Sequence, residues 1–274
     1  MKGRLFILLL FLVFLSLPSK GQQKVKVNKN TAFSLGEKMK YRLKYSFFTA
    51  GYGELTIAPQ LNYLNGKECY KITIDGYTAS FFDHILRVRD SWESYIDVTT
   101  LMPIQFKRKV EEGKYRKTEI TNFNHEGKTA RVSWKKKTPE WKSKSYEIKD
   151  PTYDIVSLYS VMRNFDYANA KIGDKFLVNT FFEDELYELE VHYLGKEVLK
   201  TELGTFNTFK LAPVLPHNSV FEDKDAIVFW ATDDRNKMLL EAKVKIKVIP
   251  GSNAKLKVEE FEGLRYPLTS KIKD

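Results

Sequence analysis

Residues 37–48 read EKMKYRLKYSFF, a regular alternation of polar and apolar side chains. The apolar positions of this stretch are Met39, Tyr41, Leu43, Tyr45 and Phe47, and lysine, arginine or serine stands between them. Successive side chains of a β-strand point to opposite faces, so a period of two predicts a half-buried antiparallel strand with one apolar and one cationic face.

Similar strand signals follow along most of the chain. The dipeptide Asn65-Gly66 predicts a two-residue hairpin, because a type I′ turn needs positive φ at both central residues. Residues 103–148 read as a meander of strands, and strands return between residues 175 and 261 with Gly195 among the predicted turns. No repeat of fixed period is present in the sequence, which disfavours a propeller.

One segment has helical periodicity instead. Apolar residues recur three and four positions apart and predict an amphipathic helix over residues 152–164, with Asp150-Pro151 as its cap and first-turn proline. The predicted fold class is therefore mainly β: a strongly curved antiparallel sheet, partly or fully closed into a barrel, whose opening or one face is covered by the helix.

The N-terminus predicts export. Lys2 and Arg4 precede an apolar run over residues 5–17, which is shorter than the roughly 20 residues needed to cross a bilayer and matches a secretory signal peptide. Small residues place the cleavage between Gly21 and Gln22, so residues 1–21 are the signal peptide and residues 22–274 a single β-rich domain in the periplasm. No cysteine follows the run for lipid attachment, and no further segment is long and apolar enough for a transmembrane span; an uncleaved N-terminal anchor is the alternative.

The charge is moderately basic. The formal net charge is +10, and removal of Lys2, Arg4 and Lys20 with the signal peptide leaves 10 − 3 = +7. Clusters at residues 107–109 and 135–137 could meet an acidic surface, or they could keep sheet edges from aggregating. Nucleic acid is not an expected partner of an exported protein. The single cysteine, Cys69, excludes an intramolecular disulfide and is expected to be buried.

Signatures of metal and nucleophile chemistry are missing from the sequence. The four histidines stand singly without zinc-ligand spacing, and no serine or cysteine nucleophile motif or phosphate-binding glycine loop is present. We therefore expect no cofactor and no metal. Carboxylates are numerous, so a carboxylate pair for glycoside cleavage stays open.

Two aromatic and acidic groups are the candidate ligand-binding residues: Trp92, Glu93 and Tyr95 in one, Trp230 and Asp233 in the other. Tryptophan and tyrosine can stack on a sugar while a carboxylate hydrogen-bonds to it. The first group could equally form cross-strand ion pairs with neighbouring cations, and residues 233–236 could be simply a hairpin turn.

Several segments taken in order resemble one family. They are Phe33–Glu37, Ala50–Gly53, Asp90–Asp97, Asp154–Arg163, Leu203–Thr208 and Phe229–Asp234. Together these segments, spread over nearly the whole chain after residue 21, resemble the domain of unknown function 3108 family of exported bacterial proteins. A proline usual after the aspartate turn is replaced around Lys237-Met238. The resemblance implies a periplasmic, β-rich protein of a double-membraned bacterium and supplies no catalytic residues.

Three functions compete at this point. The first is a non-catalytic binding or carrier module for an envelope lipid or glycan, which the 14% aromatic content and the curved sheet favour. The alternative is a structural or assembly factor of the cell envelope that binds another protein. The third is a hydrolase of envelope polymer with Glu93 and Asp233 as candidate groups. The sequence leaves the oligomeric state open.

Overall fold

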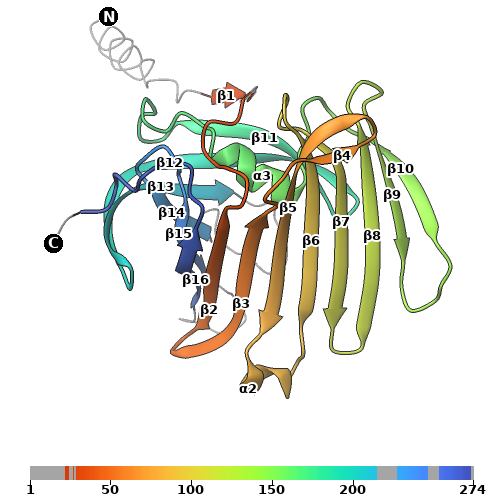
Figure 1. Ribbon diagram of the computed structural model, residues 1–274, viewed down its shortest axis with the longest axis horizontal. Coiled ribbons are helices and arrows are strands. Elements are labelled where there is room, and N and C mark those ends of the chain that lie inside the picture. Colours follow the sequence, from red (N-terminus) through yellow and green to blue (C-terminus); the bar gives the residue numbers. More distant parts are fainter. Residues whose placement is uncertain (1–21, 25–26, 28, 215–226, 246–252, 273–274) are drawn as a thin grey trace, which may run out of the picture.

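The computed structural model describes residues 22–24, 27, 29–214, 227–245 and 253–272, and in these residues all strands join one curved sheet (Figure 1). The predicted signal peptide, residues 1–21, lies outside the described residues. The strand bounds are β1 (Gln22–Lys24), β2 (Lys38–Tyr45), β3 (Phe48–Ile57), β4 (Asn62–Leu64), β5 (Lys67–Thr78), β6 (Arg89–Asp97), β7 (Pro103–Glu112), β8 (Tyr115–Asn124), β9 (Thr129–Lys135), β10 (Lys142–Glu147), β11 (Lys175–Phe182), β12 (Glu185–Thr201), β13 (Gly204–Val214), β14 (Ile227–Thr232), β15 (Leu239–Lys245) and β16 (Asn253–Glu262).

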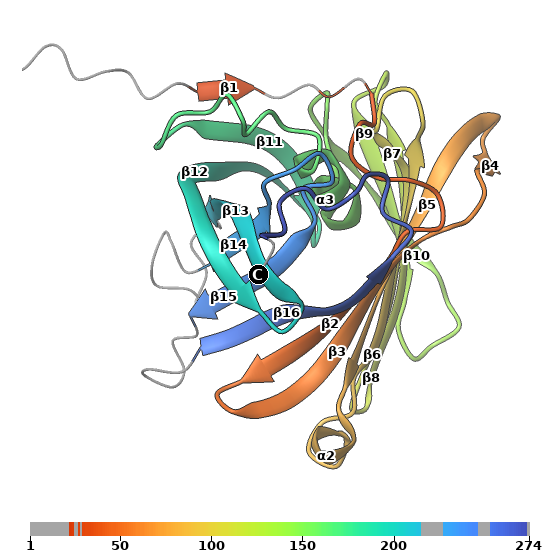
Figure 2. The same cartoon turned by 60° about the vertical axis from the view of Figure 1, so that its left-hand side comes forward.

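The sheet follows the order β1-β11-β12-β13-β14-β15-β16-β2-β3-β5-β6-β7-β8-β9-β10, with β4 paired to β5. All neighbours are antiparallel except β1 and β11. In the described part of the chain the end strands β1 and β10 do not pair with each other, so the sheet curls strongly without closing (Figure 2). The predicted curved antiparallel sheet is confirmed, in its open form.

Local sequence explains the strands. Met39 and Tyr41 of β2 are buried while Lys38 is exposed, as the alternation predicts. The hairpin between β4 and β5 is confirmed, since Asn65 and Gly66 have φ of 52° and 76°. Gly195 does not make the predicted turn: it lies at a bulge inside the single long strand β12, where its φ of 102° suits glycine.

The curvature has identifiable causes. Register shifts interrupt the β2–β3, β12–β13, β14–β15 and β16–β2 pairings, and such bulges bend a strand and increase its twist. At Gly51 of β3 the backbone of β5 comes so close that a Cβ would lie 2.5 Å from the carbonyl oxygen of Tyr77. Glycine is therefore the residue that permits this close approach of β3 and β5.

The main helix, α3 (Ile155–Met162), lies on the concave side of the sheet between its two halves (Figure 2). The helix is shorter than the predicted range 152–164, and its cap is Asp154 rather than Asp150, because the Asp154 carboxylate accepts hydrogen bonds from the backbone amides of Val156 and Ser157 at 2.8 and 2.9 Å. A second, four-residue helix, α2 (Ser80–Asp83), was not predicted.

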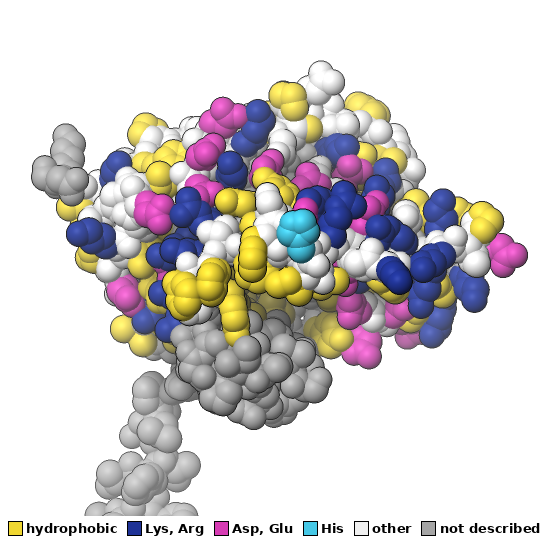
Figure 3. All heavy atoms as spheres, turned by 90° about the horizontal axis from the view of Figure 1, so that it is seen from below, with side chains coloured by type: hydrophobic (Ala, Val, Ile, Leu, Met, Phe, Trp, Pro, Cys, Tyr) yellow, Lys and Arg dark blue, Asp and Glu magenta, His cyan; other side chains and the backbone are white. Residues whose placement is uncertain are grey.

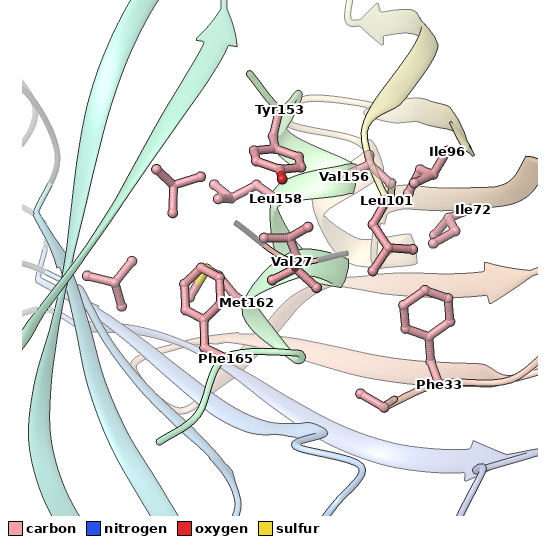
Figure 4. Packing of buried hydrophobic residues seen from close by; sticks show 14 of the residues in the cluster. Val27, Phe33, Ile72, Ile96, Leu101, Tyr153, Val156, Leu158, Met162 and Phe165 are labelled. Atoms are coloured by element: carbon pink, nitrogen blue, oxygen red, sulfur yellow. The ribbon is translucent and has the colours of Figure 1, made fainter. Parts of the chain in front are cut away.

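The core wraps around α3 rather than lying on one side of it. Val156 points toward Ile96 and Leu101, while Met162 and Phe165 lie toward the other half of the sheet (Figure 4). A helix that contacts sheet on both sides needs apolar residues around most of its circumference, which its sequence IVSLYSVM supplies.

Cys69 is fully buried in β5 and is a free cysteine, as expected. Burial raises the pKa of its thiol. The side chain therefore behaves as a small core residue.

Candidate functional site

The N-terminal end of α3 is fixed to the sheet through a buried carboxylate. Besides capping the helix, Asp154 accepts a hydrogen bond of 2.7 Å from the hydroxyl of Ser94 on β6, and its own amide donates to the Ser157 hydroxyl at 2.9 Å. Burial raises the pKa of Asp154 even though these donors oppose the rise. The helix start is thereby held against the middle of the β5–β7 half of the sheet.

The C-terminal end of α3 is fixed by a buried ion pair. The guanidinium of Arg163, only 2% exposed, binds the fully buried carboxylate of Glu37 and donates to the carbonyl oxygen of Asn236 at 2.8 Å. Burial alone would lower the pKa of Arg163, but Tyr159 and Glu37 raise it overall, so the arginine keeps its charge. Two segments distant in sequence, the entrance to β2 and the β14–β15 turn, are thus joined to the helix end.

A cavity of about 350 Å³ lies beneath the helix. The helix forms one wall, and strands β2, β3, β5, β13, β14, β15 and β16 form the others. The wall residues are mostly apolar: Tyr41, Gly53, Glu54, Leu55, Ile74, Ile155, Leu158, Tyr159, Met162, Arg163, Tyr167, Leu211, Phe229, Ala231, Lys237, Leu239 and Leu256. Its volume falls within the range of roughly 300–1,000 Å³ that is typical of small-molecule sites.

Two of the three tyrosines of the wall, Tyr41 and Tyr159, direct their polar ends into the backbone of β15, whereas the buried hydroxyl of Tyr167 has no hydrogen-bond partner among the described residues. The Tyr41 hydroxyl donates to the carbonyl oxygen of Leu239 at 3.2 Å, and the Leu239 amide donates to the Tyr159 hydroxyl at 3.5 Å. Burial raises the pKa of both phenols, so both stay neutral. The rings therefore present apolar surface to the cavity while their hydroxyls are satisfied.

Lys237 is a cation on this wall. Burial lowers the pKa of its ammonium group, and nearby Arg163 lowers it further against the opposing effect of Asp166. Among the described residues no carboxylate lies within ion-pair distance of Lys237, whereas Arg163 on the same wall is paired with Glu37. Almost all of the cavity surface is apolar, so Lys237 contributes little of it, and the wall also includes the acidic residue Glu54.

Two other hollows differ in chemistry. One of about 470 Å³ lies along β11 and includes Lys149, Asp150 and Glu188, and one of about 330 Å³ is bordered by Lys38 and Glu262 among other charged residues. Both have a mixed polar and apolar lining, whereas the cavity beneath α3 is almost entirely apolar and is the stronger candidate for a ligand with an apolar chain.

The first predicted group is divided between the two faces of β6. Glu93 forms ion pairs with Lys71 at 2.6 Å and Lys107 at 3.5 Å, and both ammonium groups lie over the ring of Tyr95. This is the cross-strand ion-pair arrangement considered as the alternative. Trp92 is on the other face, packed against Phe182 at 5.9 Å between ring centroids.

The second predicted group lies on β14 and the turn after it. Trp230 is almost fully buried beneath the Lys210 ammonium, which lies 5.4 Å from its ring. Asp233 pairs with Lys196 at 2.7 Å, and Asp234 accepts from the amide of Asn236, as expected of a turn. None of the five predicted ligand-binding residues borders the cavity, and a role for them in binding stays a prediction.

The described residues hold no cluster of three or more histidine, cysteine, aspartate or glutamate side chains that could bind a metal ion. Within the same residues, no helix has the length and apolar character required to span a membrane.

The sequence did not point to the cavity residues. Leu239, Leu256 and Phe229 occupy inward positions of ordinary alternating strands, and the same pattern describes residues that fill a core. The sequence does offer one signal in Arg163, a charged residue at the end of an apolar helical stretch, which requires a partner once it is buried.

An open, barrel-like sheet with a helix across its concave side and an apolar cavity beneath that helix defines the class of this protein. The model of the family described as protein of unknown function DUF3108 matches residues 40–259, and the chain belongs to this family. The predicted family is therefore confirmed. No curated protein sequence matches the chain.

One solved structure shares the fold at low sequence identity, and a second matches with a lower TM-score. A β-barrel-like protein of domain of unknown function DUF1849 from Brucella abortus is 11% identical, with a TM-score of 0.53 over 84% of this chain and 99% of that chain. A protein provisionally described as exported, with a YmcC-like fold, from Bacteroides fragilis is 8% identical, with a TM-score of 0.33 over 86% of this chain and 100% of that chain. The first supports a barrel-like architecture.

Proposed function

We propose that this protein is an exported, non-catalytic binding protein that holds the apolar chain of an anionic lipid in the cavity beneath α3. The observation that carries the proposal is the wall itself, which is apolar over almost all of its surface; Lys237, one of the lining residues, is the cation that we assign to the head group. Export to the periplasm rests on the signal-peptide pattern of residues 1–21.

The volume suits one alkyl chain. At about 350 Å³ the cavity is roughly twice the ~150 Å³ of an engineered apolar cavity that binds benzene, which corresponds to about twelve carbon atoms. Burial of about twelve methylene groups at ~0.8 kcal/mol each is worth up to about 10 kcal/mol before the cost of association. We expect a net affinity in the micromolar range.

A glycan is less well suited to this site. Sugars need several hydrogen-bonding groups beside an aromatic face, and almost all of the cavity surface is apolar. A lipid chain needs none.

The test compares two twelve-carbon ligands, dodecanoate and dodecanol, by displacement of a fluorescent fatty-acid probe from delipidated protein. Leu239→Trp fills the cavity and should weaken both ligands at least about tenfold, since a ring takes the place of the chain. The matched control is Val198→Trp, which adds the same side chain at an exposed position of β12. Equal affinity of the Leu239→Trp variant and the wild type would contradict the proposal.

The head-group assignment is tested separately with Lys237→Met. Loss of the ammonium should weaken dodecanoate and leave dodecanol nearly unchanged, because only the carboxylate interacts with the charge. A parallel loss of both ligands would show that Lys237 acts through the shape of the cavity and not through its charge.

A further inference from the structure

One end of the molecule carries exposed apolar side chains that the fold does not require. They are Phe47 and Phe48 in the β2–β3 turn and Phe81, Ile85 and Leu86 in and after α2, which we call the rim patch. Phe47, Ile85 and Phe81 are 78%, 71% and 69% exposed. Seen from below, this end shows hydrophobic side chains gathered beside lysine and arginine (Figure 3).

The two segments of the rim patch are neighbours because β3 pairs with β5. The amide of Ala79, just before α2, donates to the carbonyl oxygen of Ala50 at 3.0 Å, and the β2–β3 turn and α2 therefore leave the sheet side by side. The rings of Phe47 and Phe48 pack with their centroids 4.2 Å apart. Large apolar residues on two adjacent tips form a protruding surface and not a groove.

A row of lysines lies next to this patch. The row crosses three neighbouring strands: Lys243 on β15 lies opposite Lys255 on β16, which lies opposite Lys44 on β2. Lys44 is next to the last residue of β2, just before the β2–β3 turn. The described carboxylate within ion-pair distance of this row is that of Glu241, whose Oε1 lies 3.8 Å from the Nζ of Lys255. Like charges directly opposite one another destabilise a sheet, and among the described carboxylates Glu241 offsets this repulsion for Lys255 alone.

Charged groups beside α2 are largely paired with one another. Asp83 binds Arg89 at 2.6 Å and Glu111 binds Lys109 at 2.7 Å, whereas Arg87 has no ion pair with a described carboxylate. In the described part of the chain this end therefore carries an unpaired cation, Arg87, together with an unpaired carboxylate, Glu112, which lies opposite Val88.

From these observations we propose that the rim patch docks on an anionic lipid bilayer. Phenylalanine, isoleucine and leucine on protruding turns can enter the head-group boundary, while adjacent lysines contact phosphate groups, which is the pattern of peripheral membrane binding. A protein partner would need a hollow that fits two projecting tips, and its binding would not depend on vesicle composition. The inference goes beyond ligand binding and does not depend on the cavity.

The experiment is flotation of the mature chain, residues 22–274, with vesicles of phosphatidylcholine alone or with about a third phosphatidylglycerol. The wild type should float with the anionic vesicles, and less so as salt is raised. The variant Phe47→Ser/Phe81→Ser should partition at least about tenfold more weakly. The matched control Tyr63→Ser/Ile172→Ser, at positions 72% and 78% exposed and outside the rim patch, should bind like the wild type.

The charge contribution is tested with Lys44→Glu/Lys255→Glu against Lys136→Glu/Lys137→Glu, which makes the same change of charge in the β9–β10 loop. Only the first variant should lose binding to anionic vesicles. The proposal is overturned if the wild type stays in solution, if the two charge variants behave alike, or if the phenylalanine variant alters self-association without altering flotation.

Discussion

The ion pair between Arg163 and Glu37 offers a direct test of how α3 is held. We consider Arg163→Met, which keeps a similar apolar length and removes the guanidinium. The carboxylate of Glu37, with none of its surface exposed, then has no cationic partner, and the carbonyl oxygen of Asn236 loses its donor at 2.8 Å.

The magnitude follows from the burial of both charges. Removing one partner of a buried pair costs about 3–5 kcal/mol because the other charge is left uncompensated in a dry interior. For a domain of this size each kcal/mol lowers the melting temperature by about 2–4 °C, so the expected loss is about 6 to 20 °C. Urea-induced unfolding followed by circular dichroism should give the same loss as a free energy.

A second variant separates charge from packing. In Glu37→Leu/Arg163→Met both charges of this pair are absent. Replacing a buried ion pair by apolar residues is often neutral, so at least half of the stability lost in Arg163→Met should return. The control Glu262→Gln removes the exposed pair with Lys38 and should leave the melting temperature nearly unchanged. If the double variant is as unstable as Arg163→Met, or more so, the loss does not come from an uncompensated charge and the reasoning is refuted.

Three further predictions concern single residues of the sheet. Burial lowers the pKa of His125 below 6.5, so the unfolded chain binds a proton that the folded chain resists. The free energy of unfolding should therefore fall as the pH drops through 6.5 towards the lowered pKa. The measurement is the midpoint of urea unfolding at about pH 7 and at about pH 5. The difference between the two midpoints should shrink in His125→Gln and stay as in the wild type in the exposed-site control His84→Gln. Cys69, being fully buried, should react with a thiol reagent at least about a thousandfold more slowly than free cysteine until the protein unfolds, and fast reaction in the native state would contradict its burial. Gly51→Ala should cost about 1–3 kcal/mol in urea unfolding, because its Cβ would lie 2.5 Å from a carbonyl oxygen of β5. Gly76→Ala, which has no heavy atom within 4 Å of its new Cβ, should change stability by less than about 1 kcal/mol.

The strands were predictable because their signal is local. The alternation in β2 and the positive φ needed at Asn65-Gly66 depend only on neighbouring residues. Closure of the sheet was not predictable, because it depends on whether β1 meets β10, two strands far apart in sequence. Periodicity therefore left both a closed and an open barrel possible.

The start of the helix shows how two local signals can compete. Asp150-Pro151 and Asp154 both suit a helix start, and the proline drew the prediction to the earlier position. Ser157 decides for the later one, since the side chain of Asp154 and that of Ser157 each bind the backbone amide of the other residue. This reciprocal capping pattern is readable in the sequence.

The candidate site was less predictable than the fold. A cavity is the part of an apolar interior that side chains leave unfilled, and its volume depends on how far α3 stands from several strands at once. The sequence favoured conspicuous residues such as Glu93, whose charge the structure balances with Lys71 and Lys107. Inconspicuous leucines form the wall instead.

Three of the six segments that resemble the family have a common structural task. Glu37 and Arg163 hold one end of α3, and Asp154 with Ser94 holds the other. Each of these residues lies within one of the quoted segments, 33–37, 90–97 or 154–163. The resemblance therefore reports how the helix is anchored, and it does not by itself report which ligand lies beneath it.

Anchoring at both ends also limits how a ligand can reach the cavity. Lifting α3 would break the pair between Arg163 and Glu37 at a cost of about 3–5 kcal/mol, which alone makes the lifted state roughly a hundredfold to several thousandfold rarer than the closed one. Exchange on the side away from the helix avoids that cost. We therefore expect a bound lipid to exchange without lifting of α3, and Arg163→Met to loosen α3 without being needed for exchange.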